Sequence, residues 1–98
     1  MSKFLFLWEA VPGTMPADPK QRAEILGKLM EMTKKWLEER KGNEWGIFPG
    51  ASAGYAIGEG TEADALKVAM TFGPFIKFTV HPVLSWKQAG DVMKSMMG

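Results

Sequence analysis

The longest regular pattern of apolar and polar positions lies between residues 18 and 41. Apolar side chains recur there at steps of three and four residues, which places them on one face of a helix. Asp18 can cap that helix, with Pro19 at its first position and Gln21 completing a capping box. Gly42-Asn43 would end it in the left-handed conformation. The sequence predicts a helix over Asp18–Lys41 with an apolar face of Leu26, Leu29, Met30, Thr33, Trp36 and Leu37.

This apolar face is wider than a single sheet requires. Ile25, Met32 and Trp36 extend it around one flank, so that about half of the circumference is apolar, compared with roughly 100° in a simple amphipathic helix. We therefore expect another element to cover that flank. The methionines of the last helix are the candidates, in the same or in a neighbouring subunit.

Shorter patterns predict four strands and two further helices. Gly54 and Gly58 within the third strand predict a bulge or the close approach of a helix, and Pro82 is expected to end the fourth strand. Capping boxes precede both helices. The strands are predicted over residues 3–9, 44–49, 53–59 and 75–81, and the helices over residues 62–72 and 86–97.

The order β-α-β-β-α-β, followed by a C-terminal helix, predicts one ferredoxin-like domain over residues 1–98. This is an α+β fold with a four-stranded antiparallel sheet in the order 4-1-3-2 and the main helices on one face. The first strand is apolar on both faces, as a central strand must be.

Composition narrows the classes of function. Twelve basic and eleven acidic residues give a net charge of +1, so nothing suggests a nucleic-acid partner. The chain has no cysteine, which excludes disulfides, thiolate nucleophiles and cysteine metal sites and favours the cytoplasm. The apolar run Phe4–Trp8 is too short for a signal sequence, and no run approaches the ~20 residues of a membrane span. We expect a soluble protein with no membrane partner.

The fourth strand carries the most informative chemistry. Its alternation places Phe75, Lys77, Thr79 and His81 on the face that the helices leave open. The first strand adds to that face either Phe4, Phe6 and Trp8 or Leu5 and Leu7, and the pattern does not decide between them. A large exposed apolar face is uncommon on a monomer. We therefore expect a homodimer through the open sheet face, enclosing a cavity between the two sheets.

Five residues are candidates for binding a small apolar molecule there: His81, Lys77, Tyr55, Trp8 and Trp45. His81 is the one histidine of the chain, the residue type suited to acid–base chemistry; it is either a general base or, as a lone histidine favours, a strand-end residue bonded to backbone or solvent. Trp45, near the start of an edge strand, suits a pocket or an interface. For Trp8 a place in the core or the dimer contact suffices.

Other motifs do not reach the pattern that their chemistry requires. Glu59, Glu62 and Asp64 are first-turn acids, which the helix dipole favours, and no second cluster completes a metal site. The loop at residues 58–61 lacks the lysine of a phosphate loop. Ala53–Ile57 partly follows the RNA-binding strand pattern but lacks its leading basic residue and its second aromatic. We expect no metal, no cofactor and no nucleic acid.

The segments Gly54–Glu59 and Phe75–Leu84 resemble a family of small uncharacterised proteins. That family has a Gly-aromatic-Ala-Ile-x-Glu third strand and a fourth strand that ends in Pro-Val-Leu before a helix. The resemblance covers most of the chain and is sharpest from Gly54 to Trp86. The chain also looks like a member of the dimeric α+β barrel group, which includes muconolactone isomerase-like proteins and cofactor-free monooxygenases. This resemblance implies dimerisation and assigns no chemistry.

Three functional hypotheses follow. The first is a cytoplasmic homodimer that binds a small apolar molecule between its sheets. The second is a cofactor-independent isomerase or monooxygenase with His81 as the base. The third is a structural or regulatory interaction module without a ligand. The sequence does not determine whether the protein is an enzyme.

Overall fold

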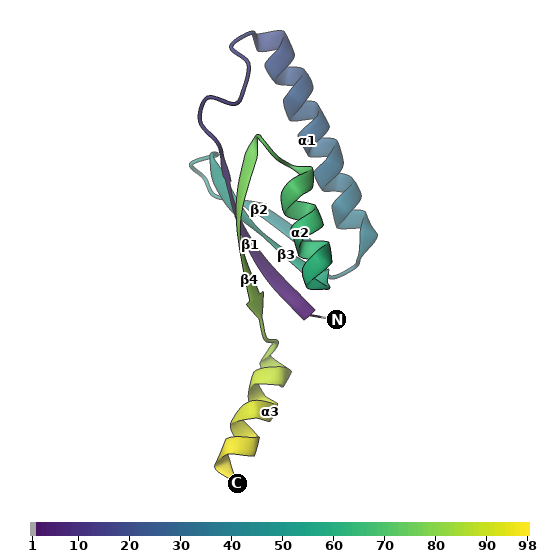
Figure 1. Cartoon of the computed structure of the whole chain (residues 1–98), viewed down its shortest axis with the longest axis vertical. Helices are drawn as coiled ribbons and strands as arrows, with labels where there is room; N and C mark the ends of the chain where they lie inside the picture. Colours follow the sequence, from purple (N-terminus) through teal and green to yellow (C-terminus); the bar gives the residue numbers. More distant parts are fainter. Residues whose placement is uncertain (1) are drawn as a thin grey trace.

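A computed structural model describes residues 2–98 as a four-stranded antiparallel sheet with three helices (Figure 1). The sheet order is β2-β3-β1-β4, so the predicted α+β class and strand order are confirmed. The elements are β1 (Ser2–Ala10), α1 (Pro19–Glu39), β2 (Glu44–Ile47), β3 (Ala53–Gly60), α2 (Glu62–Thr71), β4 (Ile76–Val83) and α3 (Trp86–Met97).

β1 is the centre of the sheet and pairs with β3 on one side and β4 on the other. Phe4, Phe6 and Trp8 turn to the helix side and are buried, whereas Leu7 is 39% exposed on the open face. The core forms where Phe6 meets the rings of Trp36 and Phe78 edge to face. The sequence left open which side chains of β1 lie on the open face. The aromatic ones belong to the core, so Leu5 and Leu7 lie on the open face.

α1 begins as predicted but ends earlier. The Asp18 carboxylate accepts a hydrogen bond from the Gln21 backbone N–H at 3.2 Å. The last helical residue is Glu39, and Arg40 is extended (φ −144°, ψ 137°), so the predicted left-handed end at Gly42 is wrong. A side chain takes its place: Asn43 donates to the Trp36 carbonyl at 2.8 Å and so ties the chain after the helix to its last turn.

Side chains also fix the starts of the other two helices. Thr61 with Asp64, and Ser85 with Gln88, form the predicted capping boxes. Pro82 lies inside β4 opposite Phe4, so the prediction that it ends the strand is wrong. β4 is an edge strand with β1 as its neighbour in the sheet, and an edge strand tolerates proline.

The helix side of β3 is a trough of small residues. Gly54, Ala56 and Gly58 are all buried on that side. A Cβ atom on Gly54 would lie 2.5 Å from the Trp8 ring, and one on Gly58 would lie 2.8 Å from the Trp36 ring. Pairing between β1 and β3 continues without a bulge. Close approach of a helix is thus found at Gly58, where the Trp36 ring of α1 lies, whereas at Gly54 the approaching groups are the Gly46 carbonyl and the Trp8 ring of the neighbouring strands.

α3 projects beyond the end of β4 and stands clear of the other elements (Figure 1), so the chain is 62 Å long but only 25 × 22 Å across. Within the chain α3 does not cover α1, where Met30 of the apolar face is 73% exposed. Among residues 2–98, no helix is both long enough and apolar enough to cross a membrane.

Candidate functional site

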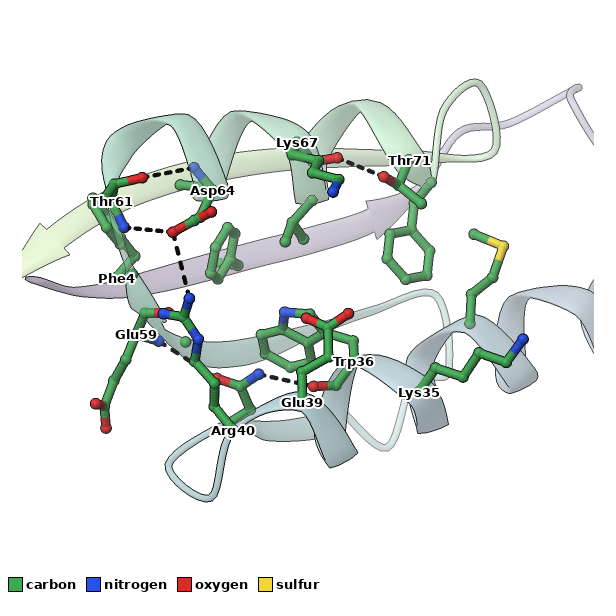
Figure 2. A pocket seen from close by; sticks show the side chains of 18 residues that line it. Phe4, Lys35, Trp36, Glu39, Arg40, Glu59, Thr61, Asp64, Lys67 and Thr71 are labelled. Atoms are coloured by element: carbon green, nitrogen blue, oxygen red, sulfur yellow. Dashed lines mark hydrogen bonds and ion pairs between the residues drawn. The ribbon is translucent and has the colours of Figure 1, made fainter. Parts of the chain in front are cut away.

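A cleft of about 270 Å³ lies between the C-terminal half of α1, α2 and the sheet (Figure 2). We call it the polar cleft, because an aromatic floor is surrounded by charged side chains. The floor is formed by Phe4, Phe6, Trp36 and Phe72, and the rim by Lys35, Glu39, Arg40, Asp64 and Lys67.

The glycine trough of β3 positions the floor. The Trp36 side chain projects from α1 and lies over Gly58. A larger residue at position 58 would displace the Trp36 ring. Its ring meets Phe6 edge to face, with centroids 6.2 Å apart and planes at 84°. Edge-to-face pairs stabilise aromatic clusters by about 1 kcal/mol beyond the area that they bury. The floor is therefore held in place by contacts within the core.

Arg40 ties the end of α1 to the start of α2. Its guanidinium donates to the Glu59 carbonyl and lies 3.6 Å from the Asp64 carboxylate (Figure 2). The Thr61 backbone N–H lowers the pKa of Asp64, the Thr61 side chain and the charges of Arg40 and Lys67 lower it further, and desolvation opposes them. Asp64 thus stays ionised, and this end of the cleft is closed by a charged, hydrogen-bonded corner.

The mouth of the polar cleft carries charges of both signs. Lys67 extends from α2 towards α1, and Glu39 extends from α1 on the opposite side (Figure 2). Lys35 lies one turn earlier on α1 and also lines the cleft. This arrangement can hold a flat apolar body against the floor and a charged group at the mouth. Among residues 2–98, no group of three or more His, Asp or Glu side chains is placed to hold a metal ion.

A second cleft of about 320 Å³ continues along the groove between α1 and α2 towards β2. We call it the apolar cleft. One wall contains Trp8 and Trp45, whose rings stack with centroids 5.5 Å apart and planes at 10°. The Trp8 indole N–H donates to the Gly46 carbonyl at 3.2 Å. Both predicted tryptophans thus lie in one wall on the helix side, away from the open sheet face.

The other three predicted residues do lie on the open face. His81 is exposed opposite Leu5, and Lys77 reaches Glu9 at 3.9 Å. The Tyr55 ring lies over Gly46. Gly46 belongs to β2, which is the edge strand opposite β4.

These three residues do not converge within one subunit. Strand spacing puts the Cα atoms of Tyr55 and His81 about 12 Å apart, and Lys77 lies about 13 Å along β4 from His81. A site that uses all three would need groups from elsewhere. The sequence reasoning missed Arg40, Lys67 and the whole polar cleft. The alternation of small residues along β3 was the available signal, because a strand without bulk on its core face must leave room for its neighbours.

The chain belongs to the family described as "Domain of unknown function (DUF3303)", whose model matches residues 3–97. The predicted membership of a family of small uncharacterised proteins is thereby confirmed. Comparisons with curated proteins and with solved structures gave no match. The family description assigns no activity, so any function must be argued from the site.

Proposed function

We propose that the protein is a homodimeric binding protein for a small molecule with a flat apolar body and a charged group, held in the polar cleft. The observation that carries this proposal is an aromatic floor beneath a rim of charged side chains. A volume of about 270 Å³ is near the lower end for small-molecule sites, which start at roughly 300 Å³. A molecule of one or two rings fits that space.

The polar cleft suits a small molecule better than the apolar cleft does. Ligand sites combine apolar walls with a few polar groups that orient the ligand. In the polar cleft, Lys35, Glu39 and Lys67 provide such groups. In the apolar cleft, Thr33 is the one hydroxyl-bearing side chain among the described lining residues, and its hydroxyl already donates to the Leu29 carbonyl at 2.8 Å.

Titration with anilinonaphthalene sulfonate, an aromatic anion, tests the polar cleft. Lys67→Glu should weaken binding of this probe at least fivefold, because it reverses the charge at the mouth. Lys20→Glu is the matched control: it makes the same change on an exposed part of α1 away from the cleft and should change binding less than twofold. Equal effects of the two variants would place the probe elsewhere and refute the proposed site.

The open sheet face supports the homodimer. Leu5, Leu7, Tyr55 and Ile57 project from β1 and β3 on that side, and Leu7 is 39% exposed. Packing two such faces would produce a dimeric α+β barrel. Sedimentation at micromolar concentration should show a dimer, and Leu7→Glu should weaken its self-association because two carboxylates would meet across the sheet-face interface. Leu66→Glu, on exposed α2, is the control; a monomeric native protein would refute dimerisation.

A dimer through the sheet face would also allow the alternative site predicted from the sequence. A cavity between two sheets would place Tyr55, Lys77 and His81 in one enclosed space, for an apolar ligand or for an isomerase or monooxygenase with His81 as the base. Native mass spectrometry of the purified protein and of His81→Ala tests this alternative: loss of a retained molecule with the dimer intact supports it. An interaction module would retain no molecule in either protein. A cytoplasmic location stays a prediction.

A further inference from the structure

α3 presents an apolar face that its own subunit leaves uncovered. Trp86, Ala89, Met93 and Met96 follow one another at steps of three or four residues, so they share one face. Trp86 is 87% exposed and Met96 is 81% exposed. A helix of 12 residues is marginal in water unless it packs against something. α3 therefore requires a surface, and Figure 1 shows none beside it in the subunit.

The apolar cleft is a surface with the matching chemistry. Leu26 and Met30 form one rim, and Trp45 and Ile47 form the other. All four are between 40% and 73% exposed, which is unusual for large apolar side chains grouped around one groove. No charged residue lines this cleft. A groove of this kind accepts the apolar face of an amphipathic helix, anchored by residues at helical spacing.

The α3 of the same chain is badly placed to fill this cleft. β4 contributes Ile76 and Phe78, near its start, to the apolar cleft, whereas α3 follows the end of β4 after only two residues. Seven residue-to-residue steps of strand lead from Ile76 to Val83, or about 23 Å, and a 12-residue helix is about 18 Å long. Folded back along β4, a helix of that length would end short of Ile76.

We propose that α3 of one chain docks by its apolar face in the apolar cleft of a second copy. A two-fold axis would allow both helices to be exchanged at once, since the same helix and the same cleft occur in each copy. Trp36, Val68 and Phe72 line both clefts. The docked helix would therefore also support the wall behind the polar cleft, and it would cover the exposed side chains of Leu26 and Met30 on α1.

Disulfide cross-linking tests the exchange, because the chain has no cysteine and any bond must come from introduced residues. A Met30→Cys chain, on the rim of the cleft, is mixed with a tagged Met93→Cys chain, and mild oxidation is followed on a non-reducing gel. Docking predicts a mixed dimer that forms at least tenfold faster than with the control Ser95→Cys, on the opposite face of α3. Equal rates for the two positions would overturn the proposal.

A double variant with Met30→Cys and Met93→Cys in one chain separates exchange from folding back. Exchange predicts a covalent dimer, whereas an internal disulfide in a chain of monomeric mass would refute the second copy as the partner. The readout is independent of the proposed function. Lys67→Glu should impair probe binding and leave the cross-link unchanged, and Leu7→Glu reports on the sheet face alone, so the three outcomes can be told apart.

Discussion

The fit of Trp36 over Gly58 makes a quantitative prediction for Gly58→Ala. The new Cβ atom would lie 2.8 Å from the Trp36 ring and 3.2 Å from the Phe6 ring. Such overpacking costs about 1–3 kcal/mol, while removing a glycine from the unfolded chain returns about 0.5–1 kcal/mol. The variant should therefore lose about 1 kcal/mol of unfolding free energy. For a domain of this size, that lowers the melting temperature by about 4–8 °C.

Gly27→Ala is the matched control, since a Cβ atom there has nothing within 4 Å. Gly27 lies in α1, so the same substitution should stabilise the protein by up to about 1 kcal/mol. Urea unfolding followed by far-UV circular dichroism, at one protein concentration, compares the two variants. In a Trp36→Leu background, Gly58→Ala should lose most of its cost, because the clashing ring is gone. If Gly58→Ala stabilises the native protein as Gly27→Ala does, the Trp36 ring does not pack against Gly58 as described.

Three further predictions concern the ends of helices and one turn. The pKa of Asp64 is lowered in the folded state, so the stability that its carboxylate contributes is fully present above the ordinary aspartate pKa of about 4 and is lost as the pH falls. Urea unfolding across pH 3–7 should therefore show that the stability deficit of Asp64→Asn relative to the native protein shrinks below pH ~4. A deficit that stays constant with pH would contradict this. Asn43→Ala should cost about 1–2 kcal/mol by urea unfolding because the Trp36 carbonyl loses its donor; an unchanged midpoint would argue against the cap. Ala51→Gly should raise the melting temperature and Ala51→Val should lower it, because Ala51 has φ +67° and a side chain is strained there; the reverse order would count against that turn.

The fold was largely predictable because its signals are local. Capping residues such as Thr61 and Ser85 act within three positions of themselves, and the topology follows from the order of the elements. The end of α1 was missed because it is set by Asn43 and Arg40, through contacts with Trp36 and with β3. These contacts join residues that are far apart in the sequence or that no local sequence pattern relates to one another.

The site was less predictable for a different reason. Alternation assigns two faces to β1 but cannot say which is buried, and both faces are apolar. The structure buries the aromatic face of β1. The neighbouring strand β3 has only Gly54, Ala56 and Gly58 on the same side of the sheet, and these small residues leave room for the aromatic rings. The polar cleft follows from that fit. Its members are spread over α1, β3 and α2, with no motif to join them.

The central position of β1 has a consequence for the protein during its synthesis. β1 is made before both of its neighbours, and β4 is complete only at Val83. Until then a strand containing Phe4, Phe6 and Trp8 lacks the neighbour that closes one of its edges. Long-range pairing of this kind is slow, and unpaired apolar strands associate with other chains. The nascent chain therefore carries this aromatic strand with one edge unpaired until β4 has been made.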